Sequence, residues 1–112
     1  MPQDWTVRRF LEACVQRRPQ PEISVLADTV SRERMGSHDP ERKYTGAGYL
    51  AFCEQRESAL RLLRASVEGN YCAYPAMDTD PLFAHLREDS EFGKIRSAAI
   101  ECRNRFLARR SN

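Results

Sequence analysis

The sequence predicts an all-α protein of about six helices. Apolar side chains recur at the three- and four-residue spacing of amphipathic helices along most of the 112 residues. No stretch sustains the alternation of apolar and polar residues that a half-buried strand shows. The pairs Asp39-Pro40 and Asp80-Pro81 repeat one helix-start signal, because Asp caps a helix and Pro fits its first turn. Six helices with short connections predict three antiparallel hairpins.

Composition is that of an ordinary single domain, here covering residues 1–112. Apolar residues make up 41% and charged residues 30%, with a net charge of +2. No apolar run approaches the roughly 18 residues that span a bilayer, which excludes a membrane-spanning protein. The first ten residues lack the apolar core and cleavage site of a secretory signal, so we expect a cytoplasmic location.

The four cysteines are far apart in the sequence, at Cys14, Cys53, Cys72 and Cys102. No C-x-x-C pair suggests zinc, and the long spacings do not outline a disulfide framework. Three of the four lie on apolar helix faces, where unpaired cysteine behaves as a small hydrophobic residue. We therefore expect buried free thiols.

Residues 4–35 are predicted to form the first hairpin, with helices over Trp5–Arg18 and Pro21–Met35. The prolines Pro19 and Pro21 separate them, since proline cannot continue a helix but tolerates its first turn. The expected buried faces consist of Val7, Phe10, Leu11, Cys14 and Val15, followed by Ile23, Leu26, Ala27 and Val30.

Residues 39–69 are predicted to form a second hairpin around which the chain is organised, with helices over Pro40–Glu54 and Arg56–Glu68. Gly46 and Gly48 each cost roughly 1 kcal/mol relative to alanine inside a helix. We expect close approach of a neighbouring helix to compensate for that cost. Ala47 and Ala59 are expected to mark the helix crossing.

Residues 71–77 are apolar for a loop and are expected to cover this hairpin. Capping helices are predicted over residues 78–110. A short helix starts at Asp80-Pro81 with Leu82, Phe83 and Leu86 inward. A last helix starts at Asp89 or Ser90 and frays after Ala108. Its apolar stripe consists of Phe92, Ile95, Ala99, Cys102 and Phe106.

The pattern of Ala47, Leu50, Ala59, Leu63 and the Ser66-Val67 pair resembles the tetratricopeptide repeat, a hairpin of about 34 residues. The family's inter-helix glycine is replaced by Glu54, and its closing proline is absent at Tyr71. The stretch from Asp80 to Phe92 is similar to the segment that closes tetratricopeptide arrays in bacterial multidomain proteins. The resemblance implies hairpins stacked as a right-handed α-α superhelix.

The resemblance also implies a non-catalytic module that binds another protein or a peptide, without a cofactor. In the family the first helices line a concave groove. The matching positions here are Glu41, Tyr44, Gly48 and Phe52. The apolar and aromatic character of Tyr44, Gly48 and Phe52 favours an apolar or aromatic contact over a charged clamp on a peptide terminus.

Catalysis and metal binding have little support in the residues. His38 and His85 are the only histidines, and no phosphate loop, nucleophile elbow or H-E-x-x-H motif accompanies them. We therefore predict no catalytic residue, no metal ligand and no bound cofactor.

Nucleic acid is the runner-up partner, because arginines crowd the last helix and a basic stripe can bind phosphates. The residues are Arg96, Arg103, Arg105, Arg109 and Arg110, with Arg8, Arg9, Arg17 and Arg18 near the start. Glu91 and Glu101 interrupt the stripe, so a solvated face is the favoured interpretation.

A homodimer is the remaining alternative, since stacked hairpins leave apolar faces at their ends unless a cap covers them. The first helix has no evident cap. Its candidate self-association face contains Trp5 and Phe10.

Overall fold

The computed structural model describes residues 2–111, and the side chains of residues 5–110. Within these residues the chain consists of helices and loops and contains no strand, which confirms the all-α prediction. The elements are α1 (Pro2–Val15), α2 (Gln20–Met35), α3 (Pro40–Phe52), α4 (Arg56–Glu68), α5 (Ala76–Thr79), the 3₁₀ helix η1 (Pro81–Leu86) and α6 (Ser90–Ser111). None of the helices described is long and apolar enough to cross a bilayer.

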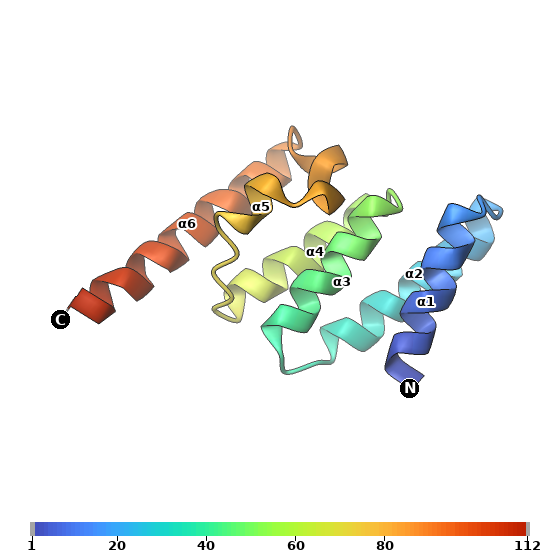
Figure 1. Ribbon diagram of the computed structural model, residues 1–112, viewed down its shortest axis with the longest axis horizontal. Coiled ribbons are helices and arrows are strands. Elements are labelled where there is room, and N and C mark those ends of the chain that lie inside the picture. Colours follow the sequence, from blue (N-terminus) through green and yellow to red (C-terminus); the bar gives the residue numbers. More distant parts are fainter. Residues whose placement is uncertain (1, 112) are drawn as a thin grey trace.

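Two helical hairpins form the body of the molecule, as Figure 1 shows. Helix α1 packs on α2 and α3 packs on α4, while α2 also contacts both helices of the second hairpin. The expected third hairpin is replaced by a split arrangement, in which η1 packs on α3 and α6 packs on α4. The C-terminal end of α6, red in Figure 1, extends past the other elements.

Three helices end in the same way, with a non-glycine residue in the left-handed region. The residues are Arg17 after α1 (φ 57°), Glu54 after α3 (φ 60°) and Asn70 after α4 (φ 71°). In each case the next N–H reaches back to the fifth carbonyl before it, as in the bond of 2.8 Å from Gln55 to Leu50. This is the Schellman ending. It stops α1 at Val15, so the Arg17-Arg18 pair lies outside the helix that was expected to include it.

The core joins both hairpins to the C-terminal segment. Its largest fully buried apolar side chains are Phe10, Val30, Leu50, Leu62, Leu63, Met77, Phe83 and Phe92. Ala47 and Ala59 have no exposed surface, as expected of residues at a helix crossing. Ala73 of the loop after α4 and Met77 of α5 are also buried, as expected of a segment that packs down as a cover.

The glycines of α3 lie where other elements come close, as the sequence predicted. A Cβ atom built on Gly46 would lie 2.9 Å from Cγ of Arg34 and 3.2 Å from Cδ1 of Leu62. A Cβ atom on Gly48 would lie 3.1 Å from Cδ1 of Leu82. Gly46 thus permits contact with α2 and α4, whereas Gly48 permits contact with η1.

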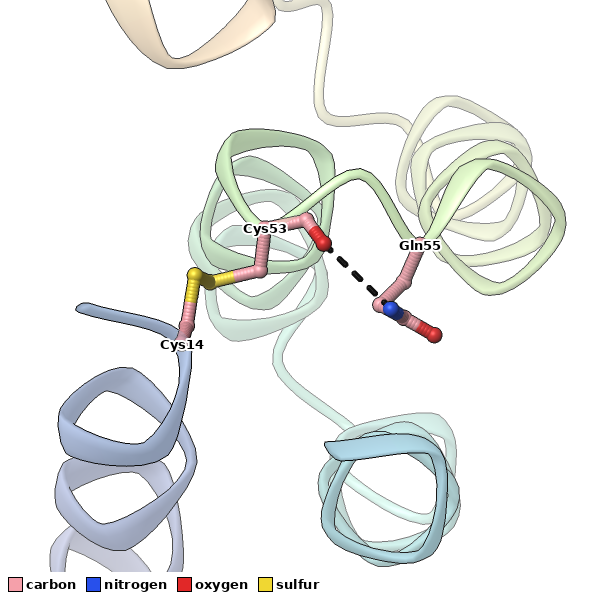
Figure 2. Close-up of a disulfide and its surroundings, with 3 residues drawn as sticks. All are labelled: Cys14, Cys53 and Gln55. Carbon is pink, nitrogen blue, oxygen red and sulfur yellow. Dashed lines mark hydrogen bonds between the residues drawn. A yellow bond between two sulfur atoms is a disulfide. The ribbon is translucent and has the colours of Figure 1, made fainter. Parts of the chain in front are cut away.

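The cysteines are paired, and the expectation of free thiols was wrong. Cys14 at the end of α1 bonds to Cys53 at the end of α3, with a Cα–Cα distance of 5.8 Å (Figure 2). Cys72 in the loop after α4 bonds to Cys102 of α6, with a Cα–Cα distance of 5.4 Å. Both separations suit a disulfide. Helix stacking brings together residues that the sequence spacing keeps apart.

Candidate protein-binding surface

The face of α3 that the resemblance marked as a groove is covered by the chain itself. The Tyr44 ring packs between those of Tyr71 and Phe83, with centroid distances of 5.3 and 5.4 Å. Gly48 lies under Leu82, and both Tyr44 and Gly48 are buried. The prediction of an open groove is therefore corrected at these two positions, because η1 and the preceding loop fill it.

Only the two ends of that expected groove remain open to solvent. Glu41 lies in the first turn of α3 and is exposed. Phe52 lies in the last turn and keeps 46% of its surface exposed. The covered face of α3 separates them, so the structure does not bring the four predicted residues into one accessible site.

Burial changes the chemistry of the covered face. It raises the pKa of the Tyr44 hydroxyl well above its usual value, and the nearby Asp80 carboxylate raises it further. Tyr44 donates a hydrogen bond of 3.2 Å to Oδ2 of Asp80. Oδ1 of the same carboxylate accepts from the backbone N–H of Leu82, which caps η1. Tyr44 is thus a structural residue that holds the covering segment.

The predicted self-association face is split between surface and core. Trp5 is 57% exposed, with the Arg9 guanidinium 5.0 Å from its ring centroid. Phe10 has no exposed surface and belongs to the core. A contact between copies could use Trp5, but Phe10 is not accessible to it.

The histidines lie at the surface on different elements. His38 lies in the loop between α2 and α3, and His85 lies on η1; both are exposed. No group of three or more potential metal ligands occurs among the described residues.

A different surface stands out at the free end of α6. The apolar stripe of this helix runs from Phe92 through Ala99 and Cys102, which are buried. One turn later the same stripe reaches Phe106, which is 56% exposed. The disulfide to Cys72 holds the loop after α4 against the stripe at Cys102. Leu107 beside Phe106 is 41% exposed.

Two hollows flank Phe106. We call this surface the α6 tip and define it by their lining residues, which are Asn70, Cys72, Tyr74, Cys102, Arg103, Arg105, Phe106, Leu107 and Arg109. The first hollow, of about 190 Å³, lies between the loop and Arg105 and Arg109. The second, of about 320 Å³, lies between Tyr74 and Leu107. The disulfide Cys72–Cys102 fixes the loop against α6 at their base.

The basic residues of α6 divide into paired and unpaired groups. Arg96 holds Asp78 with two hydrogen bonds, of 2.6 and 2.8 Å, and these lower the pKa of that carboxyl group. It does not belong to an open basic stripe. Near the other end of the chain, Arg8 and Arg18 pair with acidic residues four positions later. Arg105 and Arg109 form no ion pair with any side chain of residues 5–110.

Comparisons with protein-family models, with curated proteins and with solved structures found no match to this chain. The tetratricopeptide resemblance therefore rests on its residues alone. The α6 tip had a signal in the sequence, because both the apolar stripe and the arginines continue to the end of the last helix. The sequence did not show how far along α6 other elements would cover this stripe.

Proposed function

We propose that this protein is a non-catalytic protein-interaction or assembly module that docks a partner through the α6 tip. The observation that carries the proposal is the continuation of the buried stripe of α6 to an exposed Phe106 between two hollows. Aromatic side chains flanked by arginine are enriched at the centres of protein interfaces. Concave surfaces on both sides of the ring would receive side chains of a partner.

A tetratricopeptide-like stack is part of this proposal. It is supported by the α3–α4 hairpin with Ala47 and Ala59 fully buried, and by the packing of α2 against that hairpin. The family's usual groove face is filled here by η1, which moves the proposed contact from α3 to α6.

Selection of random twelve-residue peptides displayed on phage tests the docking site. Peptides selected on the wild-type chain are expected to lose binding to Phe106→Ser. They should keep binding to Val25→Ser, the matched control, which removes an apolar side chain with 65% exposure from α2. Both substitutions are on the surface, so each should change the free energy of unfolding by less than about 0.5 kcal/mol. Peptides that bind Phe106→Ser as well as they bind the wild type would overturn the proposed site.

Nucleic-acid binding through the arginines of α6 is the second candidate. Arg105 and Arg109 favour it, because no carboxylate among the described residues neutralises them. Binding of a duplex DNA oligonucleotide would then weaken steeply as salt is raised, since counterions are released on binding. A flat salt response, or no binding at low salt, rejects this function.

Self-association through Trp5 is the structural alternative. Sedimentation of the wild type and Trp5→Ser compares their masses at the same concentration. An unchanged mass excludes Trp5 from any interface between copies.

The cytoplasmic location expected from the sequence remains a prediction. The two disulfides favour an oxidising compartment instead, because cytosolic thiols are generally kept reduced. Trapping thiols with an alkylating reagent at the moment of cell lysis distinguishes the two. Blocked cysteines in the intact cell would contradict the disulfide-bonded state there.

A further inference from the structure

We propose that the partner segment that docks on the α6 tip is acidic, with an apolar side chain that packs against Phe106. This inference rests on the proposed function and adds the chemistry of the partner. Three arginines line the two hollows, and no acidic residue does. The surface is therefore both cationic and apolar.

The arginines of the α6 tip have no acidic partner within residues 5–110, whereas several other arginines of α4 and α6 do. Those pairs are Arg56–Asp89, Arg64–Glu91 and Arg96–Asp78. After Glu101 the last helix contains Arg103, Arg105, Arg109 and Arg110, and no acidic residue. The helix dipole places only about half a negative charge at this end, which is too little to neutralise four cations. A partner carboxylate would supply the missing charge.

The arrangement of the arginines divides the site into two parts. Arg105 and Arg109 edge the hollow that also contains Cys102, and are placed to contact carboxylates. On the other side, the guanidinium of Arg103 lies 6.0 Å from the Tyr74 ring centroid. That hollow, lined by Tyr74, Phe106 and Leu107, would receive an aliphatic or aromatic side chain.

Other occupants fit less well. A second copy in the same orientation would bring arginines against arginines, and like charges across an interface cost several kcal/mol by general experience. A flat anionic membrane would leave the concave surfaces on both sides of Phe106 unfilled. Duplex DNA would match the charge but would leave the apolar hollow without a contact.

The experiment uses the same twelve-residue peptide library and the disulfide-bonded full chain. We expect the Phe106-dependent peptides to be enriched in Asp and Glu and to contain an apolar residue. Synthetic copies should bind Arg105→Glu/Arg109→Glu at least about tenfold more weakly than the wild type, because two attractive charges become repulsive. Arg61→Glu, which reverses an exposed arginine on α4, is the matched control and should bind normally. Circular dichroism confirms that each variant keeps its helices.

Each outcome separates the two proposals. Phe106-dependent peptides that are neutral or basic, or that bind the doubly reversed variant equally well, overturn the acidic partner and leave the docking site intact. An absence of Phe106-dependent peptides overturns both proposals. If no acidic peptide binds, but duplex DNA or phosphatidylserine vesicles bind with the same dependence on Arg105 and Arg109, the acidic protein partner is rejected in favour of that ligand.

Discussion

The Tyr44 hydroxyl of α3 donates a hydrogen bond of 3.2 Å to the Asp80 carboxylate, which itself caps η1. The bond joins residues 36 positions apart and ties the covering segment to the central hairpin. Tyr44→Phe should lower the free energy of unfolding by about 1 kcal/mol, because it removes one partly buried hydrogen bond and keeps the ring. Denaturant unfolding measures the change. Tyr49→Phe, on the same helix, is the control and should have a smaller effect.

This bond also predicts a response to alkaline pH. Burial raises the pKa of Tyr44 in the folded chain above that of an unfolded tyrosine, near 10. The folded state therefore keeps its proton where the unfolded state loses it, and stability should fall as pH rises above about 10. Phenolate absorbance during the titration should show at least one tyrosine, Tyr44, that ionises only with unfolding. Ionisation of all four tyrosines before helix loss would contradict this assignment.

Glycine substitutions distinguish a tight helix contact from an open one. Gly46→Ala should destabilise the chain by about 1–3 kcal/mol, because its Cβ would meet the buried Arg34 stem and Leu62. Gly93→Ala should stabilise it by up to about 1 kcal/mol, since the added Cβ would meet nothing within 4 Å beyond its own stretch of helix and alanine favours helix. Thermal melts of both variants measure the contrast. Equal shifts for the two would mean that α3 does not pack closely at Gly46.

The approach of other elements to α3 could be predicted from sequence, but the partner of each face could not. Glycine at two interior positions is costly in any helix, so a packing reason was expected wherever the chain folded. That Leu82 fills the space beside Gly48 depends on how the short η1 segment turns after α5. This tertiary choice leaves no periodic signal, and so Tyr44 and Gly48 were predicted to face a groove.

Disulfide removal should separate the contributions of the two covalent links. Cys14→Ala/Cys53→Ala and Cys72→Ala/Cys102→Ala open loops with sequence separations of 39 and 30 residues. Each pair should lower the free energy of unfolding by about 2–4 kcal/mol, chiefly by freeing the unfolded chain. Unfolding with and without reductant checks both variants against the wild type. Thiols that react in the denatured but unreduced wild type would contradict the pairing.

The cysteine pairs show why spacing misled the sequence interpretation. The spacing between Cys14 and Cys53 does not by itself predict a disulfide. The two residues meet because α1 and α3 end side by side, as Figure 2 shows. Burial on apolar faces was the available signal, and it describes a free thiol and a half-cystine equally well. The end of α6 was difficult to predict for a similar reason. The sequence shows that the apolar stripe continues, but it does not show how far other elements cover that stripe.

Acid should weaken the attachment of α5 to α6. Hydrogen bonds from Arg96 lower the pKa of Asp78 below the unfolded value of about 3.9. The folded state therefore binds fewer protons, so this stabilisation is present above about pH 4 and is lost as pH falls through the folded pKa. The melting temperature of Asp78→Asn should fall less between about pH 5 and 3 than that of the wild type. Glu101→Gln changes an exposed carboxylate that forms no ion pair with the side chains of residues 5–110, and it should behave as the wild type does. If it instead matched Asp78→Asn, the Asp78–Arg96 pair would not be the cause.

The two disulfides divide the covalent chain into successive closed rings that neither overlap nor nest. The first closes between Cys14 and Cys53 and the second between Cys72 and Cys102. Helix α4 lies between the rings, in the single stretch of peptide chain that connects them. A protease cut inside either ring leaves one covalent molecule, whereas a cut at Arg61 or Arg64 produces two pieces held only by non-covalent contacts, such as the Tyr44–Asp80 hydrogen bond. The covalent connection between the two halves of the protein therefore depends on α4.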